Sequence, residues 1–248
     1  MILFKERQME TLSGAKRILL KISGEALMGS QSAGVDVEVC HRVALSIKEL
    51  YDSGREVALV IGGGNIFRGL DGIAQGMDRV PSDYVGMFAT IINAMLMQQV
   101  LQAVGVEACV MSSLECPKAV ESFNRDKAIR HLKNGKIVIF AGGTGQPFFS
   151  TDTNAALKSS EIKADLFMKA TKVDGVYNKD PVLYSDAVKY DTLPYSQALA
   201  EKLKVMDLTS FILCMENNIP IYVFNIFNEA GMLGVLSDKN HGTLIIGE

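Results

Sequence analysis

Two basic side chains, Lys21 and Arg68, stand beside glycines and are the first candidates for chemistry. Lys21 lies near the end of the apolar run RILLKIS (17–23), shortly before Gly24, and Arg68 follows three consecutive glycines in VIGGGNIFRG (60–69). Glycine lets a backbone pass close to a bulky group, and lysine and arginine bind anions. The two stretches therefore indicate an anion-binding site.

A third glycine turn, FAGGTGQPFFSTD (140–152), follows another apolar run. In an open parallel sheet, ligands bind outside the carboxyl ends of the strands. Three such turns at one edge would offer a continuous set of backbone N–H groups, which suits an extended polyanion such as a nucleoside triphosphate. Neither GxxxxGK[ST] nor a GxGxxG after a strand occurs, which disfavours a P-loop or a dinucleotide fold.

Each candidate residue also has an ordinary structural explanation. Lys21 could be a solvated lysine at a strand end, and Arg68 could pair with a surface carboxylate such as Asp71. Asp83 would lie in the first turn of a helix, where an acidic side chain complements the helix dipole. Two further carboxylates would serve as helix N-caps: Asp152 and Asp207.

The totals exclude several classes of protein. The 248 residues are 48% hydrophobic and 21% charged, as in an ordinary globular chain, and the net charge of -3 offers no basic surface for nucleic acid. The four cysteines are scattered, and the three histidines join no cysteine cluster at zinc-ligand spacing. We therefore expect free buried thiols in a reducing compartment.

The chain is expected to be cytoplasmic and outside the membrane. In MILFKERQMETLSGAK (1–16), charges follow after four residues, so the pattern is not that of a signal peptide. The richest apolar stretch, MFATIINAMLM (87–97), is too short to span a bilayer. Its helix is apolar nearly all round, which is typical either of an internal helix or of a subunit contact rich in methionine.

The elements that must position these residues alternate between strand and helix. Strand-like runs cover residues 17–23, 56–61, 107–113, 136–141, 164–171 and 219–226. Helical patterns cover residues 35–54, about 82–103, 124–135, and near 196–204 and 208–217, with Asn124 as an N-cap and with Gly54 and Gly135 after helix ends.

This alternation predicts an α/β fold, a three-layer αβα sandwich around a mostly parallel open sheet. Asp174-Gly175 indicates a tight turn and a small hairpin. We expect a single domain over residues 1–248, with two lobes at about 16–162 and 163–248 that share one sheet.

Five segments, taken in order, resemble the amino-acid kinase superfamily and within it the bacterial uridylate kinases. They are KRILLKISGEAL, VIGGGNIFRG, GTGQPFFSTD, KATKVDGVYNKDP and AEKLKVMDL, and the resemblance spans residues 16 to 246. TGxPFF followed by a hydroxyl residue, Thr and Asp is specific to the uridylate branch. Gln146 stands where that branch usually has Asn, Ser150 where it often has Thr, and no second Asp-Pro follows Asp180-Pro181.

The resemblance implies a role for each candidate. Lys21 would reach the transferring phosphoryl group, Asp152 would hold Lys21 in position, and Asp83 would bind the acceptor's ribose. The implied catalytic residues are Lys21, Arg68 and Asp152. The implied ATP-binding residues are Lys21, Ile22, Ser23, Gly24, Gly64, Arg68, Thr171, Tyr177 and Asp180. The implied UMP-binding residues are Gly63, Asp83, Thr144, Gly145, Gln146, Pro147, Phe148, Phe149, Ser150 and Thr151.

The activity implied is transfer of the γ-phosphoryl group of ATP to UMP, giving UDP and ADP. Mg²⁺ would be bound mainly by the nucleotide phosphates. The chain would assemble as a homohexamer, without nucleic-acid or membrane partners. Three alternatives stay open: a kinase for a carboxylate acceptor, an oxoanion-storage protein of the same fold, and a nucleotide sensor. The segment TGQPFF argues against a carboxylate acceptor, which needs no base-binding residues.

Overall fold

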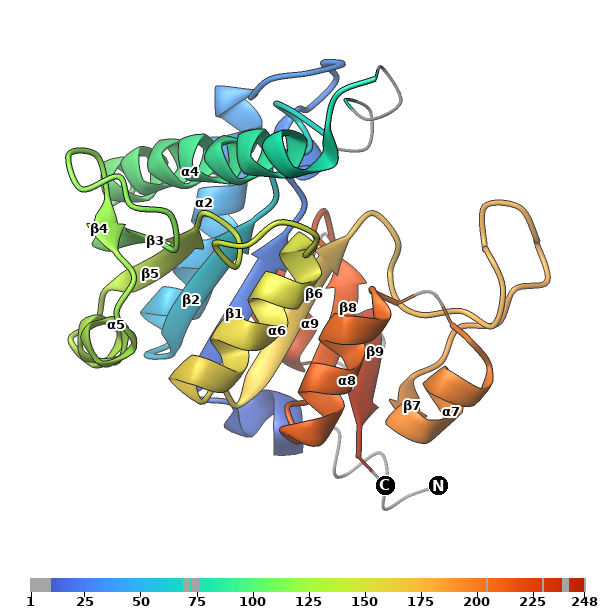
Figure 1. Cartoon of the computed structure of the whole chain (residues 1–248). Coiled ribbons are helices and arrows are strands. Elements are labelled where there is room, and N and C mark those ends of the chain that lie inside the picture. Colours follow the sequence, from blue (N-terminus) through green and yellow to red (C-terminus); the bar gives the residue numbers. More distant parts are fainter. Residues whose placement is uncertain are drawn as a thin grey trace.

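The structure, a computed structural model, describes residues 10–68, 72, 76–203, 205–228, 230–237 and 241–247. Its three layers, a sheet between two groups of helices, are seen in Figure 1. This is the α/β sandwich that the alternation of elements predicted.

Nine strands of the described chain form one sheet in the order β4-β3-β5-β2-β1-β6-β8-β9-β7. Neighbouring strands pair in parallel except for β8 and β9, which are antiparallel. The strands are β1 (Arg17–Ile22), β2 (Glu56–Ile61), β3 (Ala108–Ser112), β4 (Glu121–Ser122), β5 (Ile137–Ala141), β6 (Leu166–Thr171), β7 (Thr192–Pro194), β8 (Ile221–Asn225) and β9 (Gly242–Ile246).

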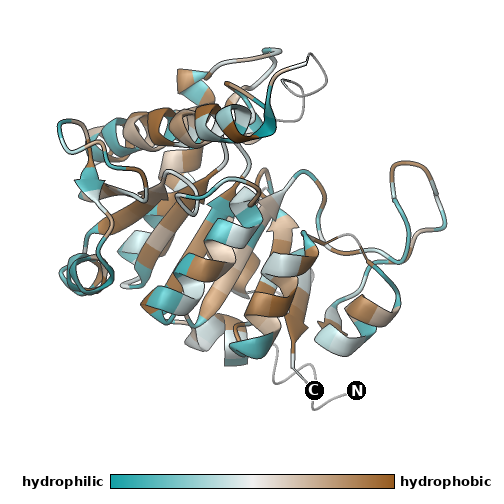
Figure 2. Ribbon diagram, in the orientation of Figure 1, coloured by the Kyte–Doolittle hydropathy of each residue, from teal (hydrophilic) through white to brown (hydrophobic). Residues whose placement is uncertain are grey.

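Helices cover both faces of the sheet, and an apolar core fills each interface. One face packs against α2 (Val37–Asp52), α4 (Arg79–Ala103) and α9 (Gly231–Ser237). The other face packs against α5 (Arg125–Lys133), α6 (Thr151–Ile162) and α8 (Leu208–Glu216). Figure 2 shows apolar residues on the strands and polar residues on the outer sides of the helices. Two further short elements are the 3-10 helix η1 (Gly24–Leu27) and α7 (Tyr195–Ala200).

The six strand-like runs all form strands, because each is apolar enough to be buried on both faces of a parallel sheet. Asn124 caps α5, and Gly54 and Gly135 follow helix ends with φ of 80° and 74°, as predicted. The sequence analysis missed three strands and one helix at the edges and the C-terminal part: β4, β7, β9 and α9.

The hairpin expected at Asp174-Gly175 is wrong in its position. The antiparallel contact joins Tyr177 to Lys189, and the backbone N–H of Asn178 donates to the carbonyl of Val188 at 3.1 Å. The segment between these residues is therefore a long projecting loop, visible at the right of Figure 1.

The long helix α4 is buried on one side only. By length and composition, this helix of 25 residues could cross a bilayer. The sequence analysis had considered only the apolar stretch 87–97, which is too short to do so. However, α4 packs on the sheet through the buried Met87, Ala94, Met97 and Leu101, as the core helix of a soluble fold does. The apolar side chains that α4 leaves exposed are Tyr84, Val85, Phe88, Ile92, Met95 and Leu96.

Candidate active site

The glycine turns after β1 and β2 lie against each other at the carboxyl edge of the sheet. Strands β1 and β2 pair in register up to Ile22 and Ile61, and the Gly62 N–H donates to the Ile22 carbonyl at 2.9 Å. A Cβ on Gly24 would lie 2.3 Å from Asn65 Oδ1 and 2.5 Å from the Gly62 carbonyl oxygen. Only glycine at position 24 therefore permits this contact between the two turns.

A buried pair of amides ties the second turn to α4. Asn65 and Asn93 are almost fully buried, and the Asn93 amide donates to Gly62 O and to Asn65 Oδ1, both at 2.7 Å. A Cβ on Gly63 would lie only 2.7 Å from the carbonyl oxygen of Gly86 in α4. Gly63 is therefore required for close packing on the helix, and the satisfied amides fix the turn in place.

Lys21 belongs to a largely buried cluster of three charges. Lys21 in β1 and Lys169 in β6 are direct partners in the parallel register, so both ammonium groups point to the same face of the sheet. The Asp152 carboxylate lies between them, with Oδ1 2.9 Å from Lys21 Nζ and Oδ2 2.6 Å from Lys169 Nζ. Lys169 also donates to the Val205 carbonyl at 2.7 Å.

The protonation states of the cluster follow from its charges. Burial alone would raise the pKa of the Asp152 carboxyl, but the charges of Lys21 and Lys169 outweigh it and hold that pKa below its usual value. Burial lowers the pKa of the Lys169 ammonium, while Asp152 acts against this shift. In the form with both lysines protonated, two ammonium groups and one carboxylate give the cluster one net positive charge.

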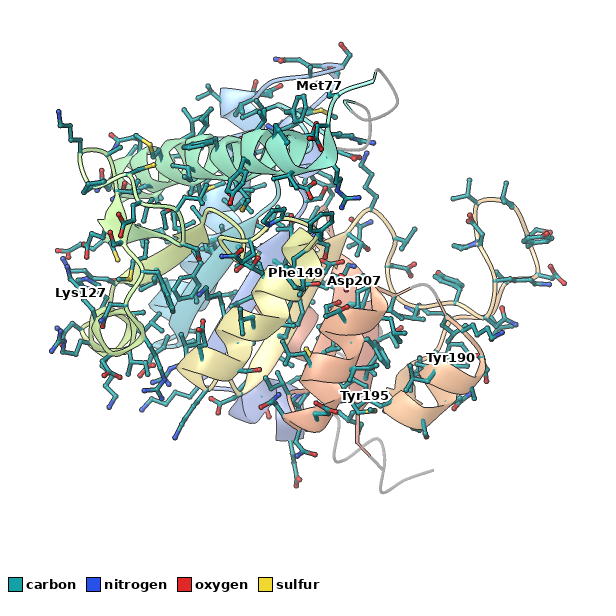
Figure 3. All side chains as sticks on the ribbon, in the orientation of Figure 1. Met77, Lys127, Phe149, Tyr190, Tyr195 and Asp207 are labelled. Atoms are coloured by element: carbon teal, nitrogen blue, oxygen red, sulfur yellow. The ribbon has the colours of Figure 1, made fainter. Side chains whose placement is uncertain are left out.

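Asp152 is not the N-cap of α6, contrary to the capping alternative. Ser150 caps the helix by accepting from the Thr153 N–H at 3.0 Å, and Asp152 lies in the first helical turn, where the dipole further favours a carboxylate. Asp207 caps α8, as predicted, and its carboxylate also accepts from the hydroxyls of Ser150 and Thr153. Figure 3 labels Phe149 and Asp207 near the adjoining ends of α6 and α8.

A cavity of about 440 Å³ lies between the glycine turns, α4 and the start of α6. Such a volume suits a small-molecule ligand. Ser150 and Thr151 at the beginning of α6 line it, and the N-terminal end of a helix favours anions. The sequence-predicted residues that line it are Gly63, Gly64, Arg68, Asp83, Gln146, Phe148, Phe149, Ser150 and Thr151.

Asp83 lies in this cavity and not in the first turn of a helix. Because α4 begins at Arg79 after its N-cap Asp78, Asp83 is in the second turn, and the dipole explanation does not apply. The Asp83 carboxylate accepts from Arg79 Nε at 2.8 Å and from the backbone N–H of Phe148 at 2.7 Å. The Arg79 guanidinium in turn lies 5.5 Å from the centre of the Phe148 ring. Asp83 thereby anchors the third glycine turn to α4.

Arg68 pairs with Glu25 at the mouth of the cavity. Arg68 therefore pairs with a carboxylate, as the structural alternative expected, but the partner is Glu25 of η1. Asp71, the partner suggested from the sequence, lies outside the described residues. About half of the Arg68 side chain is exposed, and Lys172 approaches the other oxygen of Glu25 at 3.5 Å. Two cations therefore converge on this point beside the glycine turns.

A second cavity, of about 590 Å³, lies beyond β6. Its lining includes Thr171, Tyr177 and Asp180, which the structure thus brings together, and Val205, whose carbonyl binds Lys169. The hydroxyl of Tyr177 donates to Asp174 at 2.6 Å. Burial, together with this bond, raises the pKa of Tyr177 to about 12, so the phenol remains protonated.

Eight of the sequence-predicted residues line neither cavity. Lys21 and Asp152 belong to the largely buried charge cluster, and Gly24 lies at the contact between the two turns. Ile22 is fully buried in the core, and Thr144 bonds within its own turn, to the backbone of Gln146. The others contribute backbone geometry at the turns: Ser23, Gly145 and Pro147.

Comparison with known proteins identifies the family. Residues 16–225 match the model described as the amino acid kinase family. The chain belongs to the amino acid kinase family. A uridylate kinase of Protochlamydia amoebophila (strain UWE25) is 52% identical over 232 residues, covering 93% of this chain and 92% of that protein.

Two solved structures of amino acid kinase fold are also similar. A UMP kinase from Bacillus anthracis superposes with a TM-score of 0.90 at 36% identity, covering 94% of this chain and 97% of the other. A UMP kinase from Ureaplasma parvum gives a TM-score of 0.89 at 35% identity, covering 94% and 99%. The family and the fold inferred from the sequence are confirmed.

Sequence reasoning missed three charged residues of this amino acid kinase site. Lys169 was read only as part of a strand, although a lysine inside the apolar run LFMKAT is itself a signal, since it must find a buried partner. Arg79 stands four residues before Asp83, a spacing typical of an ion pair on a helix. Glu25 carried no signal, because its pairing with Arg68 depends on the contact between two turns.

Replacing Asp152 with Asn should destabilise the fold, because it leaves two partly buried ammonium groups without a counter-charge. We expect a loss of about 3–5 kcal/mol in the free energy of unfolding, measured in urea at pH 7. The pKa of Asp152 in the folded protein is below its unfolded value of about 3.9. The difference in unfolding free energy between wild type and variant should therefore persist above about pH 3.9 and shrink as the pH falls through the folded pKa. Asp126→Asn, at a well-exposed carboxylate, should change stability by less than about 0.5 kcal/mol. A pH-independent difference would contradict the charge argument.

Proposed function

We propose that this amino acid kinase is a UMP kinase, which transfers the γ-phosphoryl group of ATP to UMP and releases UDP and ADP. The observation that carries the proposal is the position of the Lys21–Asp152–Lys169 cluster between two nucleotide-sized cavities. Asp152 follows Thr151 of the first cavity, and Lys169 binds the carbonyl of Val205, which lines the second. The kinases named above, which match over nearly the whole chain, support the same activity.

The first cavity is assigned to UMP and the second to the adenosine of ATP. Lining residues of the first fall between positions 63 and 151, and those of the second between 171 and 223, so the cavities correspond to the proposed lobes at 16–162 and 163–248. In the first, Asp83 offers a carboxylate oxygen to the ribose hydroxyls of UMP. In the second, Tyr177 supplies an aromatic face and Asp180 an acceptor for the sugar.

The chemistry requires positioning and charge compensation more than proton transfer. The 5′-phosphate of UMP already carries nucleophilic oxygens near neutral pH, so no general base has to deprotonate it. Lys21 is proposed to contact the transferring phosphoryl group, with Lys169 adding positive charge and Asp152 fixing both ammonium groups. Arg68 and the N–H groups of the glycine turns would hold the phosphates in line against their mutual repulsion.

Magnesium is expected to accompany ATP, held mainly by its phosphates. The Asp152 carboxylate is already bound by two ammonium groups, so the charge cluster, as far as the structure describes this edge, offers no free carboxylate pair for a metal. Mg²⁺ keeps several water ligands and often binds through substrate phosphates, which fits such a site. The bound ion would supply further charge compensation.

We place the enzyme in the cytoplasm, where UDP formed from UMP supplies pyrimidine nucleotide synthesis.

The chain is further proposed to self-associate as a homohexamer through α4. The exposed side of this helix carries six large apolar residues in successive turns, from Tyr84 to Leu96. A patch of this kind, next to polar surroundings, is typical of a protein interface. The two alternatives for α4 are then compatible: one side of the helix is internal, and the other is the proposed subunit contact.

The acceptor specificity tests the proposal directly. ADP release from ATP and Mg²⁺ should be rapid with UMP and slower by about 10² or more with AMP, because unpaired polar groups penalise a base that the site does not match. Lys21→Met should lower kcat by about 10²–10³, whereas Lys48→Met, at a surface pair on α2, should leave it unchanged. Activity on an amino acid but not on UMP would overturn the assignment. No ADP release with any of the acceptors would favour a storage or sensing protein.

Substitutions in the two cavities should separate the substrates. Asp83→Ala should raise KM for UMP at least about tenfold with little change in KM for ATP, and Tyr177→Ala should do the reverse. Asp126→Ala and Tyr184→Ala, on exposed surfaces, serve as matched controls. If both variants changed the same KM, the assignment of donor and acceptor cavities would be wrong.

Light scattering of the purified chain should give the mass of six chains of 27.0 kDa each. Replacing Phe88 and Ile92 with Glu should reduce this mass, because charges would then be buried at the contact. Leu208→Glu, which changes an exposed leucine on the opposite face of the sheet, should not. A single species of monomer mass would refute the hexamer.

A further inference from the structure

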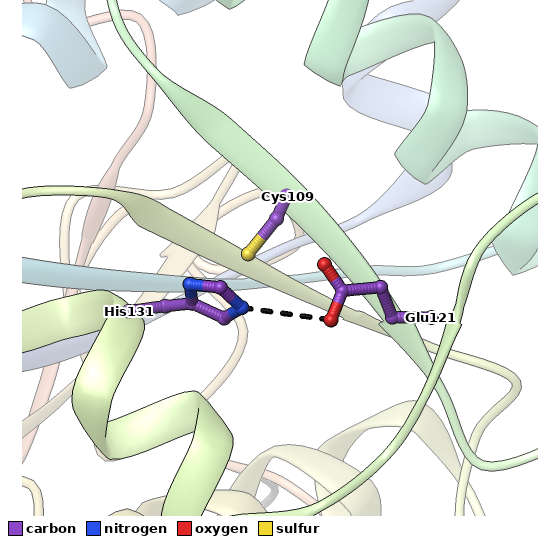
Figure 4. Close-up of side chains that lie close together, drawn as sticks. All are labelled: Cys109, Glu121 and His131. Carbon is purple, nitrogen blue, oxygen red and sulfur yellow. Dashed lines mark ion pairs between the residues drawn. The ribbon is translucent and has the colours of Figure 1, made fainter.

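A cysteine, a glutamate and a histidine from three different elements meet at the β4 edge of the sheet. This edge is distant from the central strand β6. Cys109 is in β3, Glu121 in the short edge strand β4, and His131 in the last turn of α5. One ligand atom from each lies within 4.8 Å of the other two. Figure 4 shows the three side chains pointing toward one another.

The distance between His131 and Glu121 is long for a hydrogen bond and fits two ligands of a shared ion. His131 Nε2 lies 3.5 Å from Glu121 Oε2, too far for a strong hydrogen bond. In a tetrahedral site with bonds of about 2.1 Å, two ligand atoms are about 3.4 Å apart. His131 Nε2 is also buried without a hydrogen-bond partner, and an orphaned buried nitrogen calls for an explanation.

Glu121 and the C-terminal end of α5 favour a cation at this point, where the charges of Lys127 and Lys136 already act on Cys109. His131 is in the last turn of α5, where the helix dipole stabilises positive charge. The ammonium group of Lys127 supplies part of this positive charge, because it lies 2.5 Å from Glu121 Oε2. Its side chain is 45% exposed, so it can yield to a metal ion by turning into solvent.

Cys109 has no evident use as a nucleophile. Burial, with the nearby Glu121 charge, raises the pKa of its thiol to about 11, so the group stays protonated in the protein alone. A bound divalent metal would reverse this, since a coordinating thiol loses its proton. A cavity of about 290 Å³, lined in part by Cys109 and Glu121, gives an ion a route from solvent.

We propose that Cys109, Glu121 and His131 form a zinc site, with a water molecule as fourth ligand. A thiolate, an imidazole and a carboxylate together are the donors that Zn²⁺ takes in proteins, whereas Mg²⁺ prefers oxygen alone. The site lies apart from both nucleotide cavities, whose lining includes none of these residues. Its effect is structural: the ion fastens the two-residue strand β4 and the helix α5 to β3.

Direct metal titration tests this site. The whole protein, stripped with a chelator and free of nucleotide, is titrated with Zn²⁺ in competition with a chromogenic chelator. The expected result is one zinc ion per chain, with the affinity lowered at least about tenfold by Cys109→Ser, by His131→Ala and by Glu121→Gln. Cys116→Ser, at a partly buried cysteine outside the cluster, should bind as wild type does.

Cobalt gives an independent readout of the ligands. Co²⁺ in the same protein should show an intense thiolate-to-metal charge-transfer absorption that Cys109→Ser abolishes. Circular dichroism and zinc-free kinase turnover establish that each variant is folded, because none of the three residues touches a nucleotide cavity. No binding, or binding that Cys109→Ser and His131→Ala both leave unchanged (an adventitious ion only), would overturn the proposal, and neither result bears on the kinase activity.

Discussion

The carboxylate of Asp152 between the ammonium groups of Lys21 and Lys169 is the interaction on which the site depends. Two lysines at partner positions of neighbouring strands would repel each other in a water-poor interior, and one carboxylate 2.9 Å and 2.6 Å away compensates for this. The remaining positive charge is held in a fixed position, ready for a phosphate. A site arranged in this way loses little free energy to reorganisation when the anion arrives.

The strand order explains why these groups meet at all. β1 and β6 are neighbours at the centre of the sheet, although Lys21 and Lys169 are separated by nearly 150 positions in the chain. Helix α6 packs over both strands, with Asp152 in its first turn. Parallel pairing brings the carboxyl ends of β1, β2, β5 and β6 to one edge, where each is followed by a turn that carries site residues. Both proposed nucleotide cavities therefore open from the same edge.

The sequence was sufficient for the parts of this site that depend on local pattern. Apolar runs gave the six main strands, and glycines placed after them marked the binding edge, because both features follow from the demands of a parallel sheet on each residue. The contacts of Arg68 with Glu25 and of Asp83 with Phe148 were out of reach, because they join segments far apart in the chain. The misplaced cap has the same origin: Ser150 and Asp152 are both good candidates, and only the requirement of two lysines for a counter-charge decides between them.

The polar contacts around the glycine turns show how the edge is kept rigid without large side chains. Glycines at positions 24 and 63 remove side-chain bulk at two close backbone contacts, and this alone would leave the turns free to move. The amides of Asn65 and Asn93 and the carboxylates of Asp83 and Asp207 replace the missing packing with hydrogen bonds. These bonds join the second and third turns to α4 and to the start of α8. Since the bonds of Asn93 to Gly62 and Asn65 are buried, they resist opening more than a surface contact would. The edge can therefore present backbone N–H groups to phosphates in a defined arrangement, which transfer between two repelling anions requires.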